Sequence, residues 1–380
     1  MSWLISVALS LAIAPVGGLV YEDANGNGRR DPTEVGIVGV VVSNQHDVAL
    51  TGSDGRFTLG ASGTGIVFAS VPTGYRATAG FWRRVDGDPL EIGLARIPVA
   101  REFVFVHASD THVQPSNAGR VDRVRAIADS VSAALVLVSG DLVRDALRVP
   151  EPEARGYFEL YRDLVARFPM PVWSTMGNHE NFGIERHRSL VSPDHPLYGR
   201  EMYRHYLGPD YYSFDYGGVH FVALNTVDID DLWYYGHVDS VQVAWLERDL
   251  ARLAPETPVV TFNHIPFFST SDGMRGYDDG PPAPMLIRIG GKDQFRHTVS
   301  NAREVLTRLW RHPYPLALGG HVHLRELIRY GFAGQATRFE QAAAVVGGWE
   351  DRGIAATSGI AVYRVRDGTI GESSLVPLDR

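Results

Sequence analysis

The chain has 380 residues, of which 44% are hydrophobic and 21% charged, a balance typical of a globular protein with two domains or one large domain and an appendage. Its net charge is −8 and no block of Lys or Arg stands out, so the sequence gives no support for a nucleic-acid-binding patch. It has no cysteine, which excludes disulfides, thiolate metal sites and cysteine nucleophiles, and leaves any soft-ligand chemistry to its 14 histidines.

Residues 1–17 have the pattern of a secretory signal peptide. Residues 3–16 are apolar except for Ser6 and Ser10, too short for a comfortable transmembrane span, and small residues at 12–14 offer a cleavage site. No Lys or Arg precedes this run and Pro15 follows the cleavage site, which leaves a buried N-terminal strand or helix as the alternative. We expect an exported protein, periplasmic or extracellular, without a transmembrane helix.

Residues 18–98 have the sequence pattern of a small all-β sandwich. Short Val-rich runs alternate with Gly, Asp, Asn and Pro turns, and the pattern predicts strands over 37–42, 56–59 and 66–69.

Between residues 23 and 34 oxygen-bearing side chains fall at loop positions 1, 3, 5, 9 and 12 with Gly at position 6, the ligand pattern of an EF-hand. Strand-like flanks make it similar instead to the calcium loops of Gly-rich β-sandwich domains in bacterial surface proteins, and an Asx-rich turn without an ion is the alternative. The candidate structural calcium ligands are Asp23, Asn25, Asn27, Arg29, Asp31 and Glu34.

From residue 99 to 380 buried strands alternate with helical stripes, which predicts a separate α/β domain. The expected strands are 103–108, 135–141, 171–176, 211–216, 219–224, 258–262 and 315–318, and the expected helices are 121–131, 157–168, 239–253 and 301–310. Residues 181–210 show little periodicity and are expected to run over the sheet as an irregular excursion. Residues 269–298 are expected to form a long loop at the rim of the active site. Segments 337–346 and 359–366 are expected to complete a second sheet.

Five of these strands end in side chains that bind metals. In an open α/β sheet the chemistry lies outside the carboxyl ends of the strands, so these ends are expected to meet. Side chains at i and i+2 of an extended segment share a face. Asp110 and His112 are therefore expected to point the same way, and so are His321 and His323. In chain order the strand ends supply Asp110 with His112, Asp141, Asn178 with His179, His264, and His321 with His323.

The order Asp-x-His, Gly-Asp, Gly-Asn-His-Glu, His, Gly-His-x-His resembles that of the calcineurin-like metallophosphoesterase family. The resemblance covers about Phe103 to His323. It implies an α/β (α+β) four-layer sandwich of two mixed sheets flanked by helices, with a dinuclear metal site. It also implies hydrolysis of a phosphomonoester or phosphodiester, a small-molecule substrate, by in-line attack of a metal-bridging hydroxide.

Carried over by motif, the resemblance assigns Asp110, His112 and His323 to one metal and Asn178, His264 and His321 to the other, with Asp141 as the bridge. It assigns His179 to protonating the leaving oxygen or stabilising the transition state. Mixed nitrogen and oxygen ligands suit Mn, Fe, Zn, Co or Ni. Arg144 stands where purple acid phosphatases carry an iron-binding Tyr, which argues against a tyrosinate–iron site.

Two other functions remain open at this stage. The chain could be a catalytically silent, calcium-stabilised surface or adhesion protein, or a phosphodiesterase directed at nucleotides or lipids. The remaining histidines are expected to be ordinary core or surface residues, with His187 and His195 in the excursion as candidates for touching substrate. Nothing in the sequence indicates an oligomeric state.

Overall fold

The computed structural model describes residues 15–61, 63–271, 284–332, 334–351 and 354–379. The predicted signal peptide lies almost entirely outside the described residues. In the described part of the chain, no helix combines the length and apolar character needed to cross a membrane.

The N-terminal part consists of two four-stranded sheets, in the orders β4-β1-β8-β6 and β3-β2-β5-β7. Their strands are β1 (Val16–Glu22), β2 (Val41–Ser43), β3 (Val48–Leu50), β4 (Arg56–Leu59), β5 (Ile66–Ala69), β6 (Tyr75–Ala77), β7 (Trp82–Arg84) and β8 (Leu90–Arg96). The predicted strands at 56–59 and 66–69 are confirmed. The prediction for 37–42 is wrong over residues 37–40, because the positive φ of Gly39 (77°) turns the chain and leaves Val38 65% exposed.

The first sheet of the larger part has the order β11-β10-β9-β24-β25, with β26 also paired to β24. Its elements are β9 (Glu102–Ala108), β10 (Leu135–Ser139), β11 (Val172–Thr175), β24 (Gly359–Arg366), β25 (Thr369–Ile370) and β26 (Ser374–Pro377), with helices α1 (Ala118–Ser130) and α2 (Glu151–Val165) on its outer face. β9, β10 and β11 are parallel, which confirms the predicted βαβ units. Every side chain of β10 is buried, as expected of a strand in the middle of a parallel sheet.

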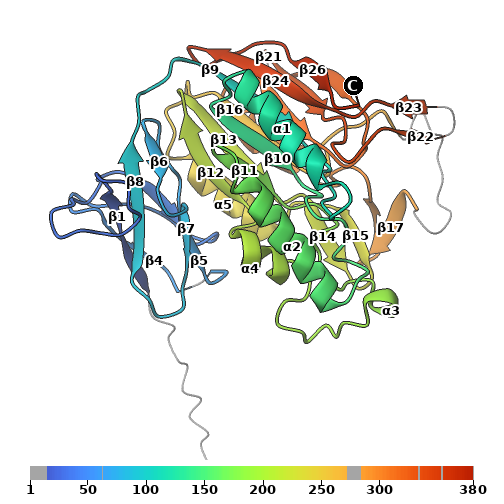
Figure 1. Ribbon diagram of the computed structural model, residues 1–380, viewed down its shortest axis with the longest axis horizontal. Coiled ribbons are helices and arrows are strands. Elements are labelled where there is room, and N and C mark those ends of the chain that lie inside the picture. The colour runs from blue at the N-terminus through green and yellow to red at the C-terminus, as the bar shows by residue number, and fades with distance from the viewer. Residues whose placement is uncertain (1–14, 62, 272–283, 333, 352–353, 380) are drawn as a thin grey trace, which may run out of the picture.

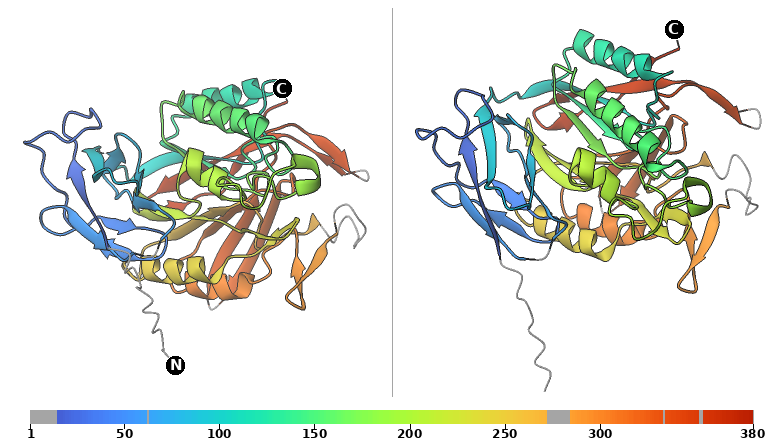
Figure 2. Two further views of the ribbon diagram at one scale, coloured as in Figure 1. Left: turned by 90° about the horizontal axis from the view of Figure 1, so that it is seen from below. Right: turned by 60° about the horizontal axis from the view of Figure 1, so that its bottom comes forward.

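The second sheet has the order β12-β13-β16-β19-β21-β20. It contains β12 (Tyr212–Tyr216), β13 (Val219–Leu224), β16 (Val259–Asn263), β19 (Leu316–Gly319), β20 (Glu326–Phe332) and β21 (Gln335–Gln341), and it is covered by α5 (Ser240–Leu250) and α7 (Ala302–Leu309). Both sheets mix parallel and antiparallel pairs and are packed between the two helical layers (Figure 2). This is the predicted four-layer α/β sandwich, preceded by an all-β part.

One topological prediction is wrong. β24 was expected in the second sheet, but it pairs antiparallel with β9 in the first, from Ala361 opposite His107 to Arg366 opposite Glu102. Tyr363 on this strand is fully buried and stacks on Phe105, with ring centroids 4.7 Å apart and planes 6° apart. This pairing satisfies the backbone groups at the edge of β9, while Arg364 and Arg366 of β24 stay exposed.

The predicted loops contain short regular elements. These are α3 (Arg186–Ser189), α4 (Glu201–Leu207), the hairpins β14 (Val227–Asp230) with β15 (Trp233–Gly236) and β17 (Leu286–Ile289) with β18 (Lys292–Phe295), and the pair β22 (Trp349–Asp351) with β23 (Ile354–Ala356). The prediction of an irregular loop over 269–298 is therefore wrong for its second half, while residues 272–283 lie outside the described part.

The N-terminal sheets pack beside β12 and α5 (Figure 1). Buried hydrogen bonds cross this contact: Tyr211 Oη donates to the carbonyl oxygen of Gln45 (2.6 Å), and Trp245 Nε1 donates to Ser43 Oγ (3.1 Å). The Gln45 amide donates to the buried Asp210 carboxylate at 3.1 Å. A single apolar cluster runs through both parts. The domain boundary near residue 98 stays a prediction.

Candidate metal centre

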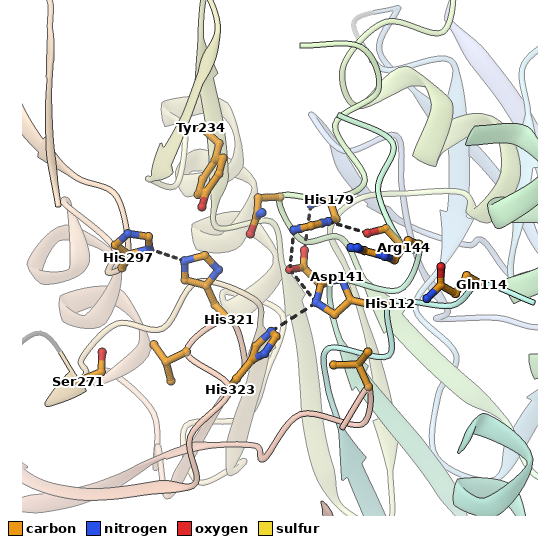
Figure 3. Close-up of a pocket in the computed structure, with 13 residues that line it drawn as sticks. His112, Gln114, Asp141, Arg144, His179, Tyr234, Ser271, His297, His321 and His323 are labelled. Carbon is orange, nitrogen blue, oxygen red and sulfur yellow. Dashed lines mark hydrogen bonds and ion pairs between the residues drawn. The ribbon is translucent and has the colours of Figure 1, made fainter. Parts of the chain in front are cut away.

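The five predicted strand ends meet at one open cavity of about 600 Å³. Side chains pointing toward its floor come from both sheets (Figure 3). The cavity is lined by His112, Gln114, Asp141, Arg144, Asn178, His179, Tyr234, Ser271, His297, His321, Val322, His323 and Val346. Asp110 and His264 lie directly beneath and are fully buried.

One group of ligand atoms gathers around the end of β9. Asp110, His112, Asp141 and His323 each offer an atom within 4.8 Å of the others. His323 Nε2 lies 3.1 Å from Asp110 Oδ1 and 3.3 Å from His112 Nε2. His112 Nε2 in turn lies 3.6 Å from Asp141 Oδ2.

A second group lies on the other side of the Asp141 carboxylate. Asp141, His264 and His321 also offer atoms within 4.8 Å of one another. His264 Nε2 is 3.2 Å from Asp141 Oδ2, 3.1 Å from Asn178 Oδ1 and 3.2 Å from His321 Nδ1. All seven predicted ligands are thus brought together, and Asp141 belongs to both groups.

These donor atoms fit a pair of cations. Two ligands bound at ~2.1 Å to one ion lie roughly 3.0–3.4 Å apart, which is the spacing seen here between facing imidazole nitrogens. His264 Nδ1 donates to the carbonyl oxygen of Ser139 at 2.9 Å, so its Nε2 is the atom turned to the site. His112 Nδ1 is buried without a hydrogen-bond partner, and its Nε2 faces the other ligands.

Asp141 and the imidazoles around it shift one another's pKa values. Burial alone would raise the pKa of Asp141, but the His264 and His179 imidazoles hold that pKa well below its usual range. Burial lowers the pKa of His112 to about 3 and that of His321 well below its ordinary value, so both rings are neutral. Asp141 outweighs burial and raises the pKa of His264 to about 9. The proton concerned is on Nε2, where a bound cation would replace it.

The backbone at the site is held in an uncommon conformation. Five of the seven predicted ligands have positive φ, namely Asp110 (54°), His112 (41°), Asp141 (48°), His321 (70°) and His323 (57°). Such positions are rare for residues other than glycine and cluster at functional sites, each costing on the order of 1 kcal/mol. Neighbouring glycines allow the close packing this requires: a Cβ at Gly177 would lie 2.3 Å from Asp141 Oδ1, and one at Gly320 would lie 1.9 Å from Ser109 Oγ.

The predicted catalytic histidine, His179, is at the cavity wall. Its Nδ1 lies 2.8 Å from the carbonyl oxygen of Arg144, which can only accept, so Nδ1 carries the hydrogen. Its Nε2 then faces the site, 3.8 Å from Asp141 Oδ2. The His179 main-chain N–H also donates to Asp141 Oδ1 at 2.9 Å, which ties the two motifs together.

Several residues at the site were not singled out from the sequence. Glu180 is fully buried and accepts backbone hydrogen bonds under Asp141; its place in the Gly-Asn-His-Glu motif was the available signal. His297 was expected to be an ordinary residue, but it lines the cavity. No periodicity or motif around it could have indicated this. Conversely, neither His187 nor His195 lines the cavity. His187 is exposed, and Nε2 of His195 lies 3.1 Å from Oε2 of Glu151.

The predicted calcium loop closes on itself through hydrogen bonds. Asp23 accepts from the N–H groups of Gly26 (2.7 Å) and Gly28 (2.7 Å), and Glu34 accepts from that of Asp31 (2.9 Å). Among the described residues, the groups of His and carboxylate ligands within 4.8 Å of one another include none from this loop. Calcium binding here stays a prediction.

Residues 103–325 match the calcineurin-like phosphoesterase family, and the chain belongs to that family. Among solved structures, a dimetal phosphatase from Danio rerio is similar with 14% identity and a TM-score of 0.46, over 73% of this chain and 99% of that one. GAP50, the anchor in the inner membrane complex of Plasmodium, is similar with 11% identity and a TM-score of 0.43, over 74% of this chain and 86% of that one. No curated protein matches the sequence.

Proposed function

We propose that this protein hydrolyses phosphate esters, either monoesters or diesters, at a dinuclear metal centre. The observation that carries the proposal is the convergence of two ligand groups that share Asp141. Family membership supports the reaction class. The donor spacing supports the metal centre.

In this proposal Asp110, His112 and His323 hold one ion and Asn178, His264 and His321 hold the other. Asp141 bridges the two. The division follows the distances: His323 and His112 face each other at 3.3 Å, whereas His264 faces His321 at 3.2 Å. Imidazole, carboxylate and amide ligands suit Mn, Fe, Zn, Co or Ni. Arg144 in place of a tyrosine disfavours a tyrosinate–iron centre.

When bound, two such ions supply Lewis acidity to the phosphoryl oxygens and lower the pKa of a shared water. The protein supplies orientation. Asp141 is fixed by the N–H of His179, and Nε2 of His179 is presented to the cavity, where it can donate a proton to the leaving oxygen or stabilise the transition state. Arg144 lines the same wall and is exposed, so its guanidinium can attract the anionic substrate.

Two further proposals come from the sequence alone. The loop from Asp23 to Glu34 is proposed to bind calcium for a structural purpose, and the protein is proposed to be exported. The first rests on the ligand spacing and the second on the apolar pattern of residues 3–16.

The test is an assay of wild-type protein, loaded with Mn²⁺, on a chromogenic phosphomonoester and phosphodiester side by side, with Asp141→Asn as the comparison. We expect turnover of at least one ester by wild type and its loss in the variant. Metal-loaded wild type with no turnover of either ester would favour the catalytically silent surface or adhesion protein. Nucleotide and lipid diesters in the same assay test the phosphodiesterase alternative.

A further inference from the structure

His297 lies directly after β18 and contacts a predicted metal ligand from outside the ligand set. Its Nδ1 is 2.8 Å from His321 Nε2 (Figure 3). The two rings are close to parallel, with centroids 5.0 Å apart and planes 24° apart. The 2.8 Å distance between the two nitrogens is that of a hydrogen bond between imidazoles.

The direction of this hydrogen bond follows from the other nitrogen of His321. His321 Nδ1 faces His264 Nε2 at 3.2 Å, in the second ligand group. An imidazole nitrogen that binds a cation carries no hydrogen, so the hydrogen of His321 is on Nε2. Nε2 then donates to Nδ1 of His297, which accepts. An acceptor in this place fixes both the tautomer and the orientation of a ligating histidine.

The His321 ring is held from a second side as well. Tyr234 packs edge-on against it, with centroids 5.9 Å apart and planes at 90°. Tyr234 is itself fixed by Arg296, whose guanidinium lies 4.4 Å from the Tyr234 ring and 5.1 Å from that of Trp233. Arg296 is only 4% exposed, so the residue before His297 is anchored in the protein rather than in solvent.

The main chain on the other side of His297 is also anchored. The N–H of Ser300 donates to the carbonyl oxygen of Gly236 (2.8 Å), and that of Val299 donates to the carbonyl oxygen of Pro266 (3.0 Å). Pro266 follows two residues after His264, and a Cβ at Gly236 would lie 2.0 Å from the backbone oxygen of residue 298. The segment carrying His297 is thus clamped between the β15 strand and the loop that carries another predicted ligand.

We propose that His297 is a positioning residue for the second metal: it accepts the Nε2 hydrogen of His321 and so aims Nδ1 of His321 into the ligand group of His264 and Asn178. The inference rests on the proposed dinuclear centre. It goes beyond that centre by adding a residue that belongs to none of the five motifs. His297 acts through His321 and is itself no ligand.

The test compares His297→Ala and His297→Asn by metal binding. Mn²⁺ affinity is measured by calorimetry and the number of ions per chain by elemental analysis. Asn keeps an acceptor oxygen close to the position of Nδ1, whereas Ala removes it. We expect His297→Ala to bind one ion as wild type does and the other 10–100-fold more weakly. His297→Asn should recover most of this loss. His187→Ala, at an exposed histidine, is the matched control and should bind as wild type.

The possible outcomes test the positioning role of His297 and the dinuclear centre separately. If wild type binds two ions and His297→Ala binds both with unchanged affinity, the positioning role is wrong and the proposed function stands. If His297→Asn is as weak as His297→Ala while circular dichroism shows both folded, the acceptor role is wrong. If wild type itself binds fewer than two ions, the dinuclear proposal fails. Should His297→Ala not fold, His297→Leu, which keeps side-chain volume but offers no acceptor, takes its place in the comparison with His297→Asn.

Discussion

The buried carboxylate of Glu180 holds the loop that carries Asp141. Its oxygens accept the backbone N–H of Asp141 (3.0 Å) and those of the next two residues (2.7 and 3.0 Å). They also accept the N–H of Gly177 (2.5 Å), just before Asn178. One side chain therefore sets the relative position of two predicted ligand loops.

Replacing this carboxylate should damage both stability and metal binding. In Glu180→Gln an amide NH₂ must face backbone N–H groups, so we expect the free energy of unfolding to fall by about 2–4 kcal/mol. Metal content should fall with it, because the loop of Asp141 loses its support. Urea unfolding and elemental analysis measure the two effects. Glu256→Gln, at an exposed site, is the control; a Glu180→Gln protein as stable as that control would contradict this role.

His179 should affect turnover without affecting metal binding. We expect His179→Asn to lower kcat by about 10²–10⁴-fold, the range of general acid–base catalysis. His179 belongs to neither of the two groups of ligand atoms, although its Nε2 lies 3.8 Å from Asp141 Oδ2. Steady-state kinetics and metal analysis of one preparation test both parts. A variant that loses its metals along with its activity would mean that His179 has a different role.

A buried histidine far from the metal centre should make stability depend on pH. His220 Nδ1 lies 2.6 Å from Asp215 Oδ1 and its Nε2 lies 3.0 Å from Asp249 Oδ2. Burial alone would lower the pKa of His220, but Asp249, followed by Asp215, raises it to about 10. The folded protein then holds a proton that the unfolded chain releases near its ordinary pKa of about 6.5, so this contribution is complete below that pH and is lost as the pH rises toward 10.

The measurement is urea unfolding of wild type and His220→Gln between pH 6 and about 10. The difference in unfolding free energy should shrink with rising pH, by at most ~1.4 kcal/mol per pH unit. Taking the difference removes the effects of other titrating groups. A difference that stays constant across this range would mean that His220 is neutral in the folded protein.

Calcium should stabilise the protein through the loop from Asp23 to Glu34. At a calcium concentration of 100 times Kd, the free energy of unfolding should rise by about 2.7 kcal/mol. Asp31→Ala is the variant to compare, because among the described residues the Asp31 carboxylate accepts from the Asn25 and Asn27 amides alone (2.7 and 3.2 Å). Thermal unfolding with and without Ca²⁺ measures the effect. An equal shift in wild type and Asp31→Ala would place the calcium elsewhere.

The sequence predicted the elements whose pattern is local. Hydrophobic runs and helical stripes indicated the parallel strands and covering helices, and motifs at the strand ends indicated every residue of the two ligand groups. α5 is capped by Asp239, which accepts the N–H of Gln242 at 2.9 Å. The Gln242 side chain does not complete a capping box. Its Oε1 accepts the N–H of Asn225 (2.9 Å), and its Nε2 donates to the carbonyl oxygen of Asn225 (2.8 Å).

What escaped prediction depends on pairing between distant segments. The pattern of residues 359–366 is that of a strand, but nothing local says which sheet edge it joins, and it joins β9 rather than the second sheet. His297 follows a short hairpin of mixed polarity, and its role appears only once that hairpin is folded against Tyr234 and His321.

The most direct test of the whole account is anomalous diffraction from crystals of the wild-type protein loaded with Mn²⁺. The account predicts two peaks per chain about 3.5–4 Å apart, the spacing of two-metal sites, on either side of the Asp141 carboxylate. One peak should be contacted by His112 and His323, and the other by His264 and His321. A single peak, or peaks away from Asp141, would contradict it.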